Sequence, residues 1–250
     1  MKKTIVTLLA LGSVSMGATI ADIDTTETAL KAYWNFDTSS DPVLGSGWSE
    51  LPVWNAEGYG VSTANNKHPY TKGAGLKANT GFTVSFDIND AQNGTLLSMT
   101  TGGMDQAWRS LSITLNNNVV SAQFHGNTST AVTETLTATQ LADEWTTLTL
   151  VGSTPTGTNT VVLDFYVNGD YIGTSSTANA ANFVGETIKN MQFGYFGTSS
   201  KSAPTNIDNI LIYNKALTAD EVKALIVPEP TTATLSLLAL AGLVARRRRR

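Results

Sequence analysis

The sequence predicts an all-β protein, an antiparallel sandwich or barrel, in the part of the chain between its two ends. The main observation is a series of short segments in which apolar and polar residues alternate, separated by turns rich in Asn, Gly and Thr. A period of two is typical of strands that bury one face, and helical periodicity is almost absent. Charged residues make up only 14% of the 250 residues. Cysteine is absent, which excludes disulfides, thiolate metal sites and a cysteine nucleophile.

Two segments show the strand pattern most clearly. In FTVSFDI, residues 82–88, the apolar side chains fall on one face and the polar ones on the other. In VVLDFYVNGDYIG, residues 161–173, an alternating strand reaches Asn168 and Gly169, the pair that a two-residue type I′ hairpin turn requires. Further strands are expected at 32–36, 110–115, 119–124, 145–151, 191–196 and 207–213.

One short helix is expected near the end of the body. Thr218 and Glu221 have the spacing of a capping box, and Leu217 and Val222 occupy the positions of a hydrophobic staple. We find no internal repeat and no linker long enough to separate two domains. The stretch 38–77 is rich in Gly, Pro, Ser and Asn, and we expect it to form long loops.

The first 21 residues have the order of a secretory signal peptide. Lys2 and Lys3 precede an apolar stretch that begins at Ile5, and a segment rich in small residues leads to Ala21. The apolar stretch is too short to span a bilayer. We therefore expect residues 1–21 to direct export through the Sec translocon and then to be removed. A buried N-terminal strand or helix is the alternative.

Residues 227–250 combine three features in order: a Pro-Glu-Pro motif, an uncharged and mostly apolar stretch at 231–245, and a terminal arginine cluster. The motif is Pro228, Glu229 and Pro230, and the cluster is Arg246, Arg247, Arg248, Arg249 and Arg250. As a helix the apolar stretch is about 22 Å long, shorter than the roughly 30 Å hydrocarbon core, so it spans only a thin bilayer. The positive-inside rule keeps the arginines in the cytoplasm as a stop.

This arrangement resembles the PEP-CTERM sorting signal of Gram-negative bacteria. The resemblance implies recognition by an exosortase-type membrane peptidase, which removes the tail near the Pro-Glu-Pro motif. The body would then pass to the cell surface, the outer envelope or the extracellular matrix, and its anchoring in the inner membrane would be transient. A permanent single-helix anchor is the alternative.

The body between the two ends is acidic, which argues against a nucleic-acid partner. Residues 19–227 contain nine Lys and Arg against nineteen Asp and Glu. An acidic surface repels phosphate backbones. The terminal arginines have no interleaved aromatic residues for base stacking.

Four motifs of the body resemble landmarks of the LamG-like, concanavalin A-like domains. They are LKAYWNFD (30–37), GFTVSFDI (81–88), EWTTLTLVGS followed by LDFYVNGDYIG (144–173) and NIDNILIYNKALTADEVKAL (206–225). The resemblance implies one antiparallel jelly-roll β-sandwich over residues 27–227, between the signal peptide and the C-terminal transmembrane helix. It departs most at 38–77 and 102–139, where such domains vary and where their ligand sites usually lie.

No catalytic motif stands out in the sequence. The Glu-x-Asp-x-x-Glu motif that some concanavalin-like hydrolases carry on a central strand is absent. We expect Asp143 and Glu144 to be solvated charges before a strand, and Asp87 and Asp90 to lie on the surface at a strand end. The two histidines lack metal-ligand spacing, and no G-x-S-x-G motif supports a serine triad.

Calcium is a candidate cofactor, because it takes carboxylate, amide and backbone oxygen ligands and LamG-like folds often bind one. Asp208 lies in the Ile-Asp motif of the last strand, where the carboxylate more often accepts structural hydrogen bonds. Asp105 and Asp41 are loop alternatives. No EF-hand spacing selects among the three.

Carbohydrate recognition needs an exposed aromatic face and polar side chains for the sugar hydroxyls. Trp34 alternates with apolar residues of a strand, so we expect it in the core. Five other aromatic residues, in irregular polar stretches, are candidates for a binding platform: Trp48, Trp54, Tyr59, Tyr70 and Trp108. The alternative is that they hold a long loop in place.

These observations predict an exported, non-catalytic protein of the cell surface or matrix whose jelly roll binds polysaccharide. Two other readings stay open. One is a glycan-cleaving hydrolase whose carboxylates are brought together by the fold. The other is a purely structural surface protein without a ligand.

Overall fold

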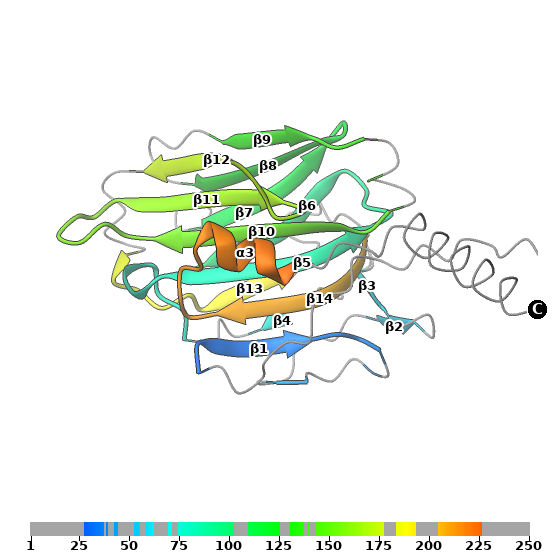
Figure 1. Ribbon diagram of the computed structural model, residues 1–250, viewed down its shortest axis with the longest axis horizontal. Coiled ribbons are helices and arrows are strands. Elements are labelled where there is room, and N and C mark those ends of the chain that lie inside the picture. The colour runs from blue at the N-terminus through cyan, green and yellow to red at the C-terminus, as the bar shows by residue number, and fades with distance from the viewer. Residues whose placement is uncertain are drawn as a thin grey trace, which may run out of the picture.

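The computed structural model describes residues 28–37, 39, 43–44, 53–55, 59–62, 70–71, 75–102, 110–125, 131–137, 140, 144–177, 184–193 and 205–226. In these ranges the chain forms two antiparallel sheets packed face to face, with one α-helix on the outside of the larger sheet (Figure 1). The predicted all-β sandwich is therefore confirmed. None of the helices in these ranges is long and apolar enough to cross a membrane. The predicted signal peptide and sorting tail lie outside the described residues.

The larger sheet has eight strands. They are β1 (Leu30–Trp34), β2 (Val53–Asn55), β3 (Tyr59–Ser62), β5 (Phe82–Asn89), β10 (Thr146–Ser153), β11 (Val161–Val167), β12 (Asp170–Thr177) and β14 (Thr205–Tyr213). The order across the sheet is β12-β11-β10-β5-β14-β3-β2, and β1 also pairs with β14. The first and last long strands of the body are thus neighbours.

The smaller sheet has six strands. They are β4 (Tyr70–Thr71), β6 (Gly94–Thr100), β7 (Ser110–Asn116), β8 (Val119–His125), β9 (Val132–Thr135) and β13 (Asn190–Phe193). Their order is β4-β13-β6-β7-β8-β9. The edge strand β9 contacts β12, the edge strand of the larger sheet, so these two edges meet along one side of the sandwich.

The hydrophobic core lies between the sheets. The apolar side chains of β5 all point into it, as their alternation predicts. The rings of Phe86 in one sheet and Phe193 in the other make an edge-to-face contact, with centroids 5.1 Å apart. Trp34 is fully buried in the same core, which confirms the expectation for that residue.

The predicted helix is α3 (Ala219–Leu225), and its capping box is present. The Glu221 backbone N–H donates to the Thr218 hydroxyl at 3.3 Å, and the Thr218 N–H donates to the Glu221 carboxylate at 2.8 Å. Val222 and Leu225 pack on the outer face of the larger sheet, by which we mean the face turned away from the other sheet. A second apolar cluster therefore holds α3 across this sheet (Figure 1).

The hairpin between β11 and β12 has the predicted turn. Asn168 and Gly169 both have positive φ, 51° and 79°, as a type I′ turn requires. The Asn168 side chain also accepts the Thr147 backbone N–H at 2.8 Å. The turn is therefore tied to the neighbouring strand β10.

The structure contains strands that the sequence did not predict, among them β2, β3, β4 and β6. The stretch 38–77 contains the short strands β2, β3 and β4, although we expected only loops. Their sequences show little alternation of apolar and polar residues. They form strands because β3 pairs with β14 and with β2, and because β4 pairs with β13. Strand β6 was not predicted because a bulge sends both Leu96 and Leu97 into the core, which breaks the period of two.

Gly152 provides a test of the core packing. A Cβ atom at this position of β10 would lie 2.2 Å from the ring of Phe82 on the paired strand. Gly152→Ala should therefore lower the free energy of unfolding by about 1–3 kcal/mol, measured by urea denaturation. The control is Gly185→Ala, where a Cβ meets nothing within 4 Å and the change should be under about 0.5 kcal/mol. Equal midpoints for the two variants would contradict the close approach.

Candidate functional site

The predicted aromatic platform is only partly within the described residues. The backbones of Trp54 and Tyr59 lie in β2 and β3 of the larger sheet, whereas that of Tyr70 lies in β4 of the smaller sheet. Trp48 and Trp108 lie outside the described residues. The structure therefore divides three of the five residues between two sheets, and the platform stays a prediction.

The predicted calcium ligands are also only partly described. Asp41 and Asp105 lie outside the described residues, and Asp208 lies in β14. Within the described part of the chain, no group of three or more His, Cys, Asp or Glu side chains is placed to hold a metal ion. Asp208 instead pairs with another carboxylate.

Asp208 and Asp87 face each other across the β14–β5 ladder on the outer face of the larger sheet. The register then shifts between Asp208 and Leu211, so that two residues of β14 stand opposite one residue of β5. This is a β-bulge, and Asn209 at its start has a φ of 48°. The bulge turns the Asn209 side chain toward Asp87, to which its Nδ2 donates at 2.9 Å.

Asp87 is 1% exposed, so the expectation that it lies on the surface is wrong. Its second carboxylate oxygen accepts a hydrogen bond from the Thr147 hydroxyl at 2.5 Å. The alternation of β5 gave the correct face for this side chain, but the outer face is itself buried around it. Thr83, Ser85 and Thr147 on the same face have no exposed surface. Asp90 and Glu144, by contrast, are exposed as predicted.

Burial dominates the electrostatics of the acidic pair. It raises the pKa of Asp87 to about 6, against the hydrogen bonds from Thr147 and Asn209, which lower it. Burial also raises the pKa of Asp208 to about 8, against the hydrogen bond from the Asn209 backbone N–H, and the charges of Asp87 and Asp37 add to the rise. Asp87 therefore loses its proton first, and its charge opposes ionisation of Asp208.

Tyr33 of β1 lies within reach of the same charges. Burial raises its pKa to about 12, and the charges of Asp208, Asp37 and Asp87 contribute. The pair therefore titrates beside a phenol that stays protonated. Because both oxygens of buried Asp87 are held by protein donors, the pair is arranged to fix the bulge rather than to meet a substrate.

The outer face of the smaller sheet has a different chemistry. The register aligns two rows of four side chains across the strands, and every member carries a hydroxyl or an amide. The first row is Gln192, Ser98, Ser112 and Gln123; the second is Thr95, Thr114, Ser121 and Thr133. We call these eight residues the neutral polar face. None of them carries a charge.

Burial varies across the neutral polar face. Four members, Thr95, Ser98, Ser112 and Gln192, are at most 6% exposed, whereas Thr114, Ser121 and Gln123 are half-buried and Thr133 is exposed. The sequence held part of this signal, since polar residues alternate with core residues at 110–115 and 119–124. The rows themselves could not be foreseen, because they depend on strand order and on β6, which the sequence did not reveal.

The chain matches the family described as the concanavalin A-like lectin/glucanases superfamily over residues 60–223. This segment is more than half of the chain, and the chain belongs to this superfamily. The LamG-like, concanavalin A-like resemblance of the body is thus confirmed. No curated protein matches the chain.

Solved structures with a similar fold include binding domains of botulinum neurotoxins. The serotype G binding domain has a TM-score of 0.51 and 14% identity over 78% of this chain and 50% of its own. The serotype D/C binding domain has a TM-score of 0.54 and 12% identity over 79% of this chain and 51% of its own.

A third similar structure is of botulinum neurotoxin type C, whose cell entry is described as dependent on interaction with two ganglioside molecules. It has a TM-score of 0.55 and 12% identity, over 79% of this chain and 50% of its own. The chain spans about half the length of these domains, and at this identity the likeness is one of fold.

The acidic pair makes stability depend on pH. Both folded-state pKa values, about 6 and about 8, lie above the unfolded value of about 3.9. The folded chain therefore holds more protons than the unfolded chain in this window. The stability that the pair contributes is complete below about pH 4 and is lost as the pH rises through 6 and then 8.

We expect the urea midpoint of the wild type to fall between pH 4 and pH 9, and Asp208→Asn to flatten the decline above pH 6. Asp90→Asn, at an exposed acid just after the same strand β5, should keep the wild-type profile and serves as the control. A wild-type midpoint that rises through this window would contradict the assignment.

Proposed function

We propose that this chain is an exported, non-catalytic protein of the cell surface or matrix that binds carbohydrate through the neutral polar face of its smaller sheet. The observation that carries the proposal is the alignment of eight hydroxyl and amide side chains in two rows. Four of them reach the surface and could contact a sugar: Thr114, Ser121, Gln123 and Thr133. Membership of a superfamily of lectins and glucanases supports carbohydrate as the ligand class.

The chemistry of the face fits a neutral sugar chain. Hydroxyl and amide groups can both donate and accept hydrogen bonds, as sugar hydroxyls do. Each can therefore pair with a sugar hydroxyl as donor or as acceptor. A charged face would instead hold counter-ions and water, and an apolar face would favour another protein. The acidic body makes a phosphate-rich ligand unfavourable.

Binding is favoured over glycan cleavage by the arrangement of the acidic pair. Glycoside hydrolysis needs two carboxyl groups on either side of the scissile bond, open to the sugar. Asp87 and Asp208 lie on the sheet opposite to the neutral polar face, and Asp87 is buried with both oxygens hydrogen-bonded. A hydrolase remains the rival reading, because the superfamily also includes glucanases.

Ser121→Phe tests the neutral polar face. Ser121 is half-buried in β8, and a phenyl group there would block the face and remove a hydroxyl. In a screen of the full chain against purified polysaccharides, we expect this variant to bind at least about tenfold more weakly than the wild type. Asn159→Phe places the same side chain in an exposed turn between β10 and β11 and should bind normally.

Other results of the same screen would redirect the proposal. Unchanged binding by Ser121→Phe would exclude this face as the site. Release of reducing sugar by the wild type would favour the hydrolase. No binding to any polysaccharide would favour the purely structural reading.

For localisation, we propose export through the Sec translocon by residues 1–21 and sorting by an exosortase-type peptidase at residues 227–250. The support is the order of motif, apolar stretch and arginine cluster at the end of the sequence. Membrane contact would last only until the tail is removed.

Glu229→Ala tests the sorting step. If the Pro-Glu-Pro motif is the recognition point, the variant should keep its C-terminus and remain in the inner membrane, whereas the wild type should lose the tail. Mass spectrometry of the C-terminal peptide and fractionation measure the two results. Wild-type protein that keeps Arg250 in the mature envelope would support the permanent anchor instead.

A further inference from the structure

Strand β12, at the edge of the larger sheet, contains a β-bulge where it pairs with β11. Phe165 pairs with Gly173 and Tyr166 pairs with Tyr171, so Ile172 stands without a partner residue in β11. The extra residue bends the strand and brings Tyr171 close to Thr174 on the same face. The Tyr171 hydroxyl lies 2.5 Å from the Thr174 hydroxyl.

The ring of Tyr171 is held from two sides. It makes an edge-to-face contact with the buried ring of Tyr166, with centroids 5.5 Å apart and planes at 64°. Thr174 donates its only hydroxyl hydrogen to Asp164, at 2.5 Å. Tyr171 must therefore be the donor to Thr174, and its own oxygen keeps its lone pairs for an external donor. The ring is fixed before any ligand arrives, which lowers the entropy lost on binding.

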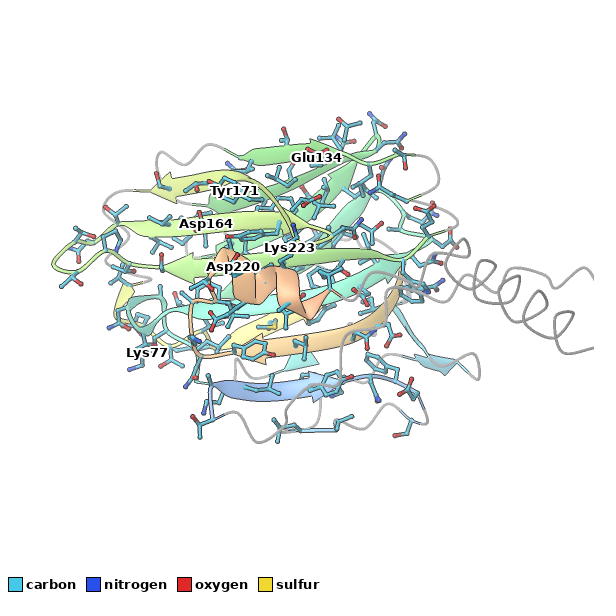
Figure 2. The ribbon with its side chains drawn as sticks, viewed as in Figure 1. Lys77, Glu134, Asp164, Tyr171, Asp220 and Lys223 are labelled. Atoms are coloured by element: carbon cyan, nitrogen blue, oxygen red, sulfur yellow. The ribbon has the colours of Figure 1, made fainter. Side chains whose placement is uncertain are left out.

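The ring is also accessible. Tyr171 is 56% exposed, and Val43 is the other large apolar side chain that is exposed among the described residues. Figure 2 shows Tyr171 and Asp164 on the side of the sheet that carries α3, next to one another and clear of the helix. Two polar side chains border the ring: Thr174, which is hydrogen-bonded to the Tyr171 hydroxyl, and Asp164, which is hydrogen-bonded to Thr174.

We propose that Tyr171, Thr174 and Asp164 form a second carbohydrate-contacting surface, which takes a pyranose ring on the tyrosine and its hydroxyls on the threonine and carboxylate. A pyranose is amphipathic, with C–H groups on its faces and hydroxyls at its rim. A fixed phenol ring bordered by a hydroxyl and a carboxylate matches that pattern. A protein partner would need a contiguous apolar patch, whereas here the ring is single.

The position of this surface has a functional consequence. It lies on the outer face of the larger sheet, while the neutral polar face lies on the outer face of the smaller one. The two faces point in opposite directions across the sandwich, so one sugar chain cannot lie on both. A single protein chain would therefore join two polysaccharide chains. This step rests on the proposed function, because it needs the neutral polar face as the first site.

The experiment separates binding from cross-linking. The full chain is mixed with the soluble polysaccharide that it binds most tightly, and turbidity and light scattering follow the formation of large complexes. The wild type should cross-link the polysaccharide. Tyr171→Ala should still bind through the other face but should raise the concentration needed for cross-linking at least about tenfold.

Three further variants complete the test. Tyr171→Phe keeps the ring and should retain most of the cross-linking, whereas Asp164→Asn should weaken it. Val43→Ala removes the other exposed apolar side chain and should behave as the wild type. Because Tyr171 is exposed, its alanine variant should fold, and thermal melting checks this.

The outcomes distinguish the two proposals. Cross-linking by Tyr171→Ala at the wild-type concentration overturns the second surface and leaves the proposed function standing. The second surface is also overturned if the only effect of Tyr171→Ala is to change the molar mass of the protein without polysaccharide, measured by light scattering. The ring would then be a contact between copies of the protein. A wild type that binds no polysaccharide overturns both.

Discussion

Strand β5 is buried on both faces, and the rest of the structure depends on how its polar face is satisfied. One face supplies aromatic and aliphatic side chains to the core, but the other carries two hydroxyls, a carboxylate and, at the end of the strand, the amide of Asn89. Each of these finds a partner on a neighbouring element. Ser85 bonds to Thr149 at 2.8 Å, Thr83 accepts the Leu217 N–H at 3.0 Å, and Asp87 is bonded on both oxygens. A slip of one residue would lose all of them, so this polar network specifies the register.

The same network explains why the two outer faces differ. Thr83 also donates to the Lys215 carbonyl at 2.9 Å, which ties the segment before α3 to the sheet, and α3 then closes over the apolar patch beside it. The middle of the larger sheet is therefore covered, whereas Tyr171 at its β11–β12 edge is exposed. No described helix covers the smaller sheet in this way, and its outer face carries the uncharged rows.

The features that could be predicted from the sequence are those that one strand or turn determines by itself. The features that depend on the pairing of strands could not be predicted. Alternation located β5 and β11 almost to the residue, and the Asn168-Gly169 pair identified the turn, because these signals are local. Asp87 was misplaced because alternation tells which face a side chain takes, not whether that face is covered. The bulge at Asn209 depends on a partner strand more than 100 positions away in the chain, and no local pattern announces it.

The paired carboxylates of Asp87 and Asp208 show how this fold accommodates two neighbouring acids. A buried acid is costly, and the pair of Asp87 and Asp208 is tolerated because protein donors hold Asp87 and because a raised pKa lets Asp208 keep its proton. Opening this pair to a sugar would remove the donors that fix the bulge, and with it the junction of β14 and β5. The fold therefore uses these carboxylates for its own register. The side chains that reach solvent include Thr114, Ser121, Gln123 and Thr133 on the outer face of the smaller sheet. On the outer face of the larger sheet they include the fixed ring of Tyr171. These are the groups through which we propose that a sugar chain is held.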